Sequence, residues 1–254
     1  MRRSLILAAS IAVLASSLGG GVSAQTAHAP ASYAAALADP VRPAEDRARD
    51  AARHTAETLA FAQVAPGQKI ADMIIGGGYF TRVFAAATGP QGSVTGWQPD
   101  EFLKFDPNYA ASLAAIDAIP NVDAVSSPIA APAFPSGLDL IFTAQNYHDL
   151  HLTPFGADTA TRVNAAAFAA LKPGGLYVII DHNAAAGSGL SATNTLHRID
   201  IEAVKAEAQA AGFVLDGESD ILANTTDPLT ANVFDEAIRG ETSQFMLRFK
   251  KPQI

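Results

Sequence analysis

The sequence predicts an α/β fold in which a mostly parallel sheet is doubly wound, with helices on both of its faces. From about residue 69 onward, short apolar segments of strand length alternate with segments of helical pattern. The apolar runs 138–144 and 176–181 are continuous rather than alternating, which is typical of parallel strands buried on both faces. A glycine turn, residues 76–78, joins a strand to a helix.

The N-terminal half of this fold is predicted from charge pattern and from glycine and proline breaks. A helix begins near Pro43 and extends to about Gln63, because acidic and basic residues alternate there on an alanine-rich background. The run Val64-Ala65-Pro66-Gly67 ends it. We then expect a strand over 69–75, a helix over 79–87, a strand over 92–97, a mostly helical stretch over 101–119 and a third strand over 121–125.

The C-terminal half repeats the alternation and ends differently. A buried strand over 138–144 precedes a helix over 158–171, which the run Lys172-Pro173-Gly174-Gly175 ends. A second buried strand follows over 176–181, and a helix over 199–211 is closed by Gly212. Residues 213–222 and 243–249 alternate in polarity, so we expect them to form a terminal antiparallel pair.

The first 24 residues have the three parts of an export signal. Met1-Arg2-Arg3 is basic, residues 5–18 are apolar, and Val22-Ser23-Ala24 is a small-residue cleavage site. The apolar run is shorter than the roughly 20 residues of a membrane span, so an uncleaved anchor is the weaker alternative. We expect a signal peptide over 1–24, a flexible leader over 25–39 and a single domain with an N-terminal helix over 40–254. The protein would then be periplasmic or secreted, with no stable membrane anchor after cleavage.

Composition excludes several chemistries. The 254 residues are 49% hydrophobic and 17% charged, with a formal net charge of −8 and no cysteine. Without cysteine there are no disulfides, thiolate metal sites or cysteine nucleophiles, and no lipoprotein anchor. The acidic balance argues against nucleic acid as a partner, because such binding depends on neutralised phosphates. The composition gives no indication of the oligomeric state.

The glycine turn predicts a site for a nucleotide or another anionic or polar ligand. Asp72 lies in the strand before it, and a helix begins at Tyr79 directly after it. Glycines let backbone N–H groups approach a ligand, and a helix N-terminus favours negative or polar groups. A purely structural turn is the alternative for this segment taken alone.

Several segments resemble one enzyme superfamily. Residues 70–81, IADMIIGGGYFT, resemble the first motif of class I S-adenosylmethionine-dependent methyltransferases, and residues 170–181, ALKPGGLYVIID, resemble the loop and fifth strand of that fold. Residues 138–142 fit the fourth strand of that fold. Residues 210–213 look like the junction between a helix and its sixth strand. More narrowly, residues 147–149, 196–200 and 238–240 look like an uncharacterised group of exported bacterial predicted methyltransferases. The resemblance extends over about 42–252, and it implies a seven-stranded sheet with an antiparallel last strand.

The resemblance also implies a cofactor and the residues that bind it. S-adenosylmethionine would contact Asp72, Gly76, Gly77, Gly78, Gln98 and Asn146. Two positions depart from the family pattern. Ile74 stands where the motif usually has glycine, and Gln98 stands where an acidic residue usually binds the ribose hydroxyls. Asp100 or Glu101 could take over the second role.

Polar residues follow the two buried strands, at the sheet edge where ligands of open α/β sheets bind. His148 is the expected general base, since the ordinary histidine pKa lies near neutrality, and Tyr147 and Asp181 are expected to act with it. As an alternative, His148 and His151 simply bond the loop backbone, and Asp181 and Asp200 cap helices or form salt bridges. A metal site using His148, His151, Asp181 or His182 is chemically allowed, but no ligand spacing demands one, so no metal is predicted.

Other charged and aromatic residues have two interpretations each. Arg198 and Arg239 either bind an acidic group of the substrate or form structural ion pairs. Trp97 and Tyr79 either stack on an adenine or, as the default, pack in the core. The charged N-terminal helix is interpreted as a solvated face or a lid.

The hypothesis that follows is an S-adenosylmethionine-dependent methyltransferase acting on an unknown small-molecule acceptor. The first alternative is an exported, non-enzymatic ligand-binding protein with a degenerate methyltransferase fold. Export favours that alternative, because the methyl donor is made in the cytoplasm. The second alternative is a metal-assisted hydrolase that uses the histidines.

Overall fold

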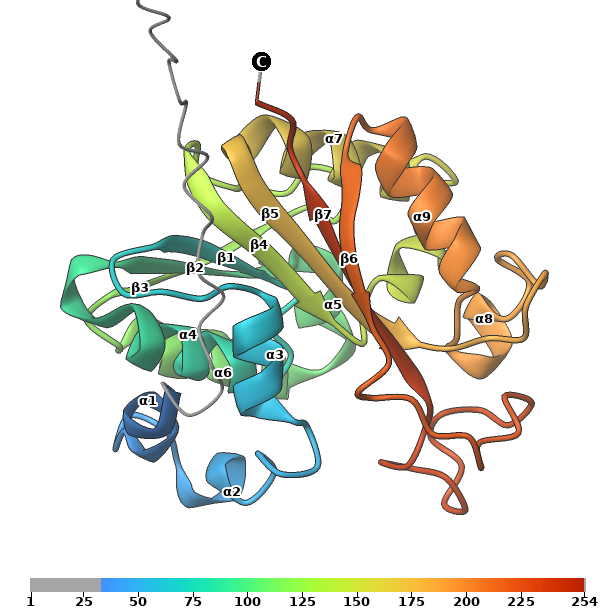
Figure 1. Cartoon of the computed structure of the whole chain (residues 1–254), viewed down its shortest axis with the longest axis horizontal. Coiled ribbons are helices and arrows are strands. Elements are labelled where there is room, and N and C mark those ends of the chain that lie inside the picture. The colour runs from blue at the N-terminus through green and yellow to red at the C-terminus, as the bar shows by residue number, and fades with distance from the viewer. Residues whose placement is uncertain (1–32, 254) are drawn as a thin grey trace, which may run out of the picture.

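A computed structural model describes residues 33–253 of the chain (Figure 1). The expected signal peptide, 1–24, and residues 25–32 of the expected leader lie outside the described residues. The rest of the leader is not irregular, because Ala34–Ala38 form helix α1. Within 33–253, no helix is both long enough and apolar enough to cross a membrane.

A single seven-stranded sheet with the order β3-β2-β1-β4-β5-β7-β6 forms the centre of the molecule (Figure 1). Its strands are β1 (Lys69–Met73), β2 (Ser93–Pro99), β3 (Val122–Ser127), β4 (Leu138–Ala144), β5 (Leu171–His182), β6 (Val214–Ser219) and β7 (Gln244–Lys250). All neighbours pair in parallel except β7, which is antiparallel to both β5 and β6. The predicted doubly wound, mostly parallel sheet with an antiparallel last strand is therefore confirmed.

Helices cover both faces of the sheet. Helix α4 (Tyr79–Thr88) and helix α6 (Pro107–Asp117) pack on one face, and α5 (Asp100–Phe105), α7 (Thr159–Ala170) and α9 (Ile201–Ala210) pack on the other. Each face has its own buried apolar cluster. Neighbouring residues of one strand alternate between the clusters, as Ile70 and Ala71 do in β1.

Two helices expected to be continuous are broken. The expected helix over 43–63 is instead α2 (Ala44–Arg47) and α3 (Thr55–Phe61), separated by turns and by His54, which has a left-handed φ of 45°. The expected helix over 101–119 divides into α5 and α6, because Asp106 is extended and caps α6 through a bond from the Asn108 N–H. Pro107, which lacks an N–H, fits the first position of the new helix.

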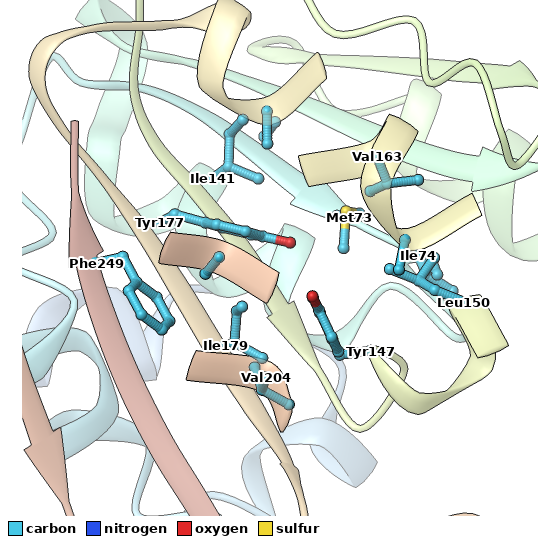
Figure 2. Packing of buried hydrophobic residues seen from close by; sticks show 14 of the residues in the cluster. Met73, Ile74, Ile141, Tyr147, Leu150, Val163, Tyr177, Ile179, Val204 and Phe249 are labelled. Carbon is cyan, nitrogen blue, oxygen red and sulfur yellow. The ribbon is translucent and has the colours of Figure 1, made fainter. Parts of the chain in front are cut away.

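Figure 2 shows the apolar cluster on the α7 and α9 face of the sheet. The ring of Tyr147 lies in this cluster with Met73, Val204 and Ile179, and the residue has no solvent exposure. Tyr147 thus anchors the segment after β4 in the core. Directly after Tyr147, His148–His151 form the short helix η3.

Candidate functional site

A cavity of about 480 Å³ lies where β1 and β4 end, at the carboxyl edge of the parallel strands, where the sequence predicts a ligand site. The glycine turn, η3 and the start of α6 contribute to its wall. Its lining includes Asp72, Ile74, Gly76, Gly77, Tyr79, Phe102, Phe105, Asp106, Tyr109, Gln145, Asn146, His148, Asp149, His182 and His197. The cavity therefore combines aromatic rings with carboxylates and imidazoles.

The glycine turn leaves free space beside two of its glycines. A side chain built at Gly76 or Gly77 would meet no atom within 4 Å, so there is room for a ligand beside both residues. Gly78 does not line the cavity; a side chain there would collide with Ile116, which explains the need for glycine. Gly78 precedes α4 with a φ of 77°, a conformation that glycine adopts without strain.

Ile74 has a backbone conformation that β-branched residues rarely adopt. Its φ is 63°, in the left-handed region. The backbone is held on both sides, because the Ile74 N–H donates to Trp97 O at 2.8 Å and Asn146 Nδ2 donates to Ile74 O at 3.0 Å. The motif's usual glycine would be unstrained here, whereas the isoleucine of this chain lines the cavity and belongs to the apolar cluster on the α7 and α9 face of the sheet.

Asp72 is a buried carboxyl at the floor of the cavity. It is 3% exposed, and Thr81 Oγ1 donates to it at 2.5 Å. Burial raises the pKa of Asp72 to about 6, although Thr81 and the more distant arginine charges act in the opposite direction. Asp72 is therefore mostly ionised at neutral pH despite its burial.

Gln98, which was expected to contact the ribose of the cofactor, does not line the cavity. It is fully buried, and its Oε1 accepts the Gly76 N–H at 3.1 Å, while its Nε2 has no partner. Asp100 and Glu101 do not line the cavity either. The carboxylate on this side is Asp106, which sequence reasoning missed; its position before Pro107, as a helix cap, was the available signal.

A compact group of three side chains, from η3 and from His197, lines another part of the cavity wall. His148 Nε2 lies 3.2 Å from Asp149 Oδ1 and 3.3 Å from His197 Nδ1. These three residues are called the triad below. Asp181 lies behind it, fully buried, where Oδ1 contacts His148 Nδ1 at 2.8 Å and Oδ2 accepts the His148 N–H at 2.7 Å.

The charges around the triad are strongly coupled. Burial by itself would lower the pKa of His148, but Asp181 and Asp149 raise it to about 10. Burial would likewise raise the pKa of Asp181, yet the His148 ring keeps it below its ordinary value. Burial lowers the pKa of His197 and lowers that of His182 to about 4. The ring of His148 thus holds positive charge at neutral pH, and its two histidine neighbours are neutral.

Two residues of the same segment are directed into the core instead. The Tyr147 hydroxyl donates to Glu207 at 2.8 Å and accepts from Asn164 at 2.7 Å, and burial raises the pKa of Tyr147 well above its ordinary value. His151 also contacts Glu207, at 3.1 Å. Neither lines the cavity. Tyr147, expected to be catalytic, is therefore a buried support beneath η3. Asp181 does not line the cavity; it contacts His148 and accepts the His182 N–H, and both of these histidines do line it.

A second cavity of about 360 Å³ adjoins the first and shares part of its wall, including Arg53, Gln145, His182 and Phe234. Three arginines contribute to its lining: Arg49, Arg53 and Arg239. Among residues 33–253, none of the three has a carboxylate within ion-pair distance. By contrast Arg198, the other candidate for substrate binding, is buried in an ion pair with Asp227.

The N-terminal segment forms part of the site rather than a solvated face. Asp50 contacts Arg42, which is fully buried, and accepts the Tyr79 hydroxyl at 2.5 Å. Arg53 lies 4.6 Å from the centre of the Tyr79 ring and donates to Gln145 Oε1 at 3.2 Å. Burial and Arg49 lower the pKa of Arg53 to about 10, so it remains charged at neutral pH.

Comparison with solved structures finds this fold in methyltransferases. The chain is similar to a SAM-dependent methyltransferase from Aquifex aeolicus, at 16% identity and TM-score 0.55, covering 87% of this chain and 97% of that one. It is similar to a TehB-like SAM-dependent methyltransferase from Corynebacterium glutamicum, at 16% identity and TM-score 0.51, covering 82% and 97%.

A third similar structure is the [4+2]-cyclase SpnF, at 16% identity and TM-score 0.55, covering 80% of this chain and 82% of that one. No protein-family model matches the chain, and no curated protein matches it. At these identities the comparisons establish the fold: the chain has the seven-stranded, Rossmann-like architecture of class I S-adenosylmethionine-dependent methyltransferases.

Proposed function

We propose that this protein is an S-adenosylmethionine-dependent methyltransferase that acts on a small anionic acceptor. The observation that carries the proposal is the pair of adjoining cavities at the carboxyl edge of the sheet. The first is bounded by the glycine turn. Arg49 and Arg53 line both cavities, and Arg239 lines the second alone. Two chambers with a common wall suit a reaction between two bound molecules, because methyl transfer depends mainly on alignment.

The first chamber has groups that fit the cofactor. Gly76 and Gly77 leave open space beside the turn. Asp106 offers a carboxylate for hydroxyl groups, and Phe102 and Tyr109 offer aromatic surface for an adenine. When bound, S-adenosylmethionine supplies an electrophilic methyl group. Asp72, at the floor, would carry the negative charge that a sulfonium or ammonium group favours.

The second chamber suits an acceptor with a carboxylate or phosphate. Unpaired guanidinium groups form charge-assisted, bidentate bonds to such anions. Gln145, on the common wall, holds Arg53 through Oε1 and bonds Gln244 through Nε2, so the arginine is positioned before any ligand binds. His148 remains the hypothesis for proton acceptance; at a pKa of about 10 it must first lose its own proton.

The test is calorimetric titration of the chain with S-adenosylmethionine and S-adenosylhomocysteine. We expect saturable binding of one molecule per chain, weakened by Asp106→Ala. Asn108→Ala, on the solvent side of the same turn, is the matched control. Absence of binding at millimolar ligand would refute the methyltransferase proposal.

A second candidate is a non-enzymatic ligand-binding protein that retains the fold. Two observations favour it: Ile74 takes a glycine position against the cavity, and Gln98 occupies the Gly76 N–H that a ligand could use. This candidate predicts binding of small anions without binding of S-adenosylmethionine. The same titrations, with inorganic phosphate added as a ligand, separate the two.

We propose, in addition, that the protein is exported after removal of residues 1–24. The support is the basic, apolar and small-residue order of that segment. Mass spectrometry of the protein from a bacterial host should find a periplasmic chain that begins at Gln25. A full-length chain that starts at Met1 and stays in the cytoplasm would contradict the proposal.

A further inference from the structure

The triad presents three acceptor atoms to one point at the cavity wall. His148 Nδ1 faces the Asp181 carboxylate at 2.8 Å and carries a hydrogen, so a metal ion that displaces the second ring proton would bind the lone pair of Nε2. Nε2 faces both Asp149 Oδ1 and His197 Nδ1. A proton can bridge two of these atoms, whereas a cation can join all three.

The spacing of the three atoms matches the edge of a metal coordination shell. The ligand atoms lie within 4.8 Å of one another, with 3.2 Å between His148 Nε2 and Asp149 Oδ1 and 3.3 Å between His148 Nε2 and His197 Nδ1. Bonds of about 2.0–2.1 Å to a tetrahedral ion put neighbouring ligand atoms roughly 3.3 Å apart. The triad is therefore close to a ligand arrangement without rearrangement of the backbone.

The surroundings also suit a metal ligand. Metal-bound histidines commonly donate their other ring N–H to a carboxylate, which fixes the ring, and Asp181 stands in that position behind His148. His148 and Asp149 are buried, and both line the cavity together with His197, so further coordination positions would face the space where an acceptor binds. Two imidazoles and one carboxylate favour a borderline divalent ion such as zinc.

From this geometry we propose that His148, Asp149 and His197 bind one divalent transition-metal ion, with Asp181 orienting His148. The ligand set differs from the one considered in the sequence, because Asp149 and His197 replace His151, Asp181 and His182. A bound ion and proton acceptance by His148 exclude each other, since both use Nε2. With the ion present, it would lower the pKa of an acceptor hydroxyl directly. The proposal does not depend on methyl transfer.

The test uses the chain without a histidine tag, stripped with a chelator and titrated with Zn²⁺ by calorimetry. We expect one ion per chain and, with Co²⁺ in place of Zn²⁺, the visible absorption bands of a low-symmetry site. Asp149→Asn and His197→Gly should each weaken Zn²⁺ binding by roughly 100-fold. Glycine keeps the left-handed backbone of His197, whose φ is 54°, so the second variant is expected to fold.

The matched control is His54→Gly. His54 is also a partly exposed histidine with a left-handed φ, and it contributes nothing to either cavity. Its replacement should leave Zn²⁺ affinity unchanged. Failure of the wild-type chain to bind Zn²⁺ stoichiometrically would overturn the proposal, and so would equal affinity in the two triad variants and the wild type. S-adenosylmethionine titrations of the stripped chain report on the methyltransferase proposal separately.

Discussion

At Ile74, a β-branched side chain is combined with a left-handed backbone. Alanine strains this conformation by about 1 kcal/mol relative to glycine. We therefore expect Ile74→Gly to have a free energy of unfolding about 1 kcal/mol higher than Ile74→Ala, although both lose stability against the wild type. Urea unfolding of the two variants measures the difference.

The matched control for Ile74 is Ile179, which is buried in β5 and is not among the residues with positive φ. There the order should reverse, with Ile179→Ala more stable than Ile179→Gly, because glycine loses more conformational freedom in a strand. The same order at both positions would contradict the strain assigned to Ile74.

Asp72 makes stability depend on pH. Its pKa in the folded protein is raised from 3.8 to about 6, so the folded state binds the proton more tightly than the unfolded state. The associated stabilisation is complete below pH 3.8 and is lost as pH rises through about 6, a change on the order of 3 kcal/mol. Asp72→Asn should remove this loss, so its stability relative to wild type should increase between pH 4 and pH 8.

Denaturant unfolding at several pH values checks the Asp72 prediction. The Asn side chain can still accept the Thr81 hydroxyl, so the two proteins differ mainly in the titrating group. A constant stability difference between the variant and the wild type across this range would show that Asp72 titrates normally.

At the residue scale, the sequence indicated several residues that line the cavity, but it did not indicate in which direction neighbouring side chains point. Asp72, Asn146 and His148 line the cavity, and the roles assigned to them in cofactor binding and catalysis stay predictions. Tyr147 is one residue before His148 and is directed into the core, because successive residues of a short helix point to different sides. His197 comes from a distant segment, so nothing in local spacing could assign it to His148.

At the scale of elements, a buried ion pair between Arg42 and Asp50 holds the N-terminal segment in shape, and Asp50 links that segment to α4 by accepting the Tyr79 hydroxyl. Arg42 is fully buried and the Asp50 side chain is 19% exposed, so loss of one partner leaves a charge without compensation. Asp50→Asn should lower the free energy of unfolding by about 3 kcal/mol. Limited proteolysis should also cleave within 33–63 before the sheet unfolds.

Asp158→Asn provides the control for Asp50→Asn. It disrupts the exposed pair with Arg162 on α7, and exposed pairs of this kind contribute little to stability. Equal destabilisation by the two variants, or protection of residues 33–63 in Asp50→Asn, would argue against this role for the buried pair.

Elements were predicted well wherever apolar runs were continuous, and less well where charge pattern was the evidence. Strand β4 was predicted with its bounds, Leu138–Ala144, because both of its faces are buried and the run is apolar throughout. The prediction of one helix over 43–63 was wrong, because a charge pattern along the sequence contains no information on tertiary hydrogen bonds. Asp50 bonds Arg42 and Tyr79, and this holds the middle of the segment in turns.

At the scale of the whole molecule, the two chambers should respond separately to mutation. Arg239 lines the second chamber and not the first. We expect Arg239→Gln to weaken binding of inorganic phosphate about tenfold, the loss of one charge-assisted contact, and to leave the affinity for S-adenosylmethionine unchanged. Calorimetry with each ligand measures both.

Arg162→Gln, an exposed arginine on α7, is the control for Arg239. It should change neither affinity. Loss of S-adenosylmethionine binding in Arg239→Gln would mean that the chambers are one site, and unchanged phosphate binding would remove the basis for an anionic acceptor.

The long connection between β6 and β7, residues 220–243, contains no helix or strand and yet supplies Phe234 and Arg239 to the second chamber. Its base is fixed by Asp227, which accepts bonds from the buried Arg198 and from the Ser243 N–H. In evolutionary terms, a chain built this way can exchange one acceptor for another through substitutions and insertions at the tip of a single connection. The sheet, the glycine turn and the triad would be inherited unchanged.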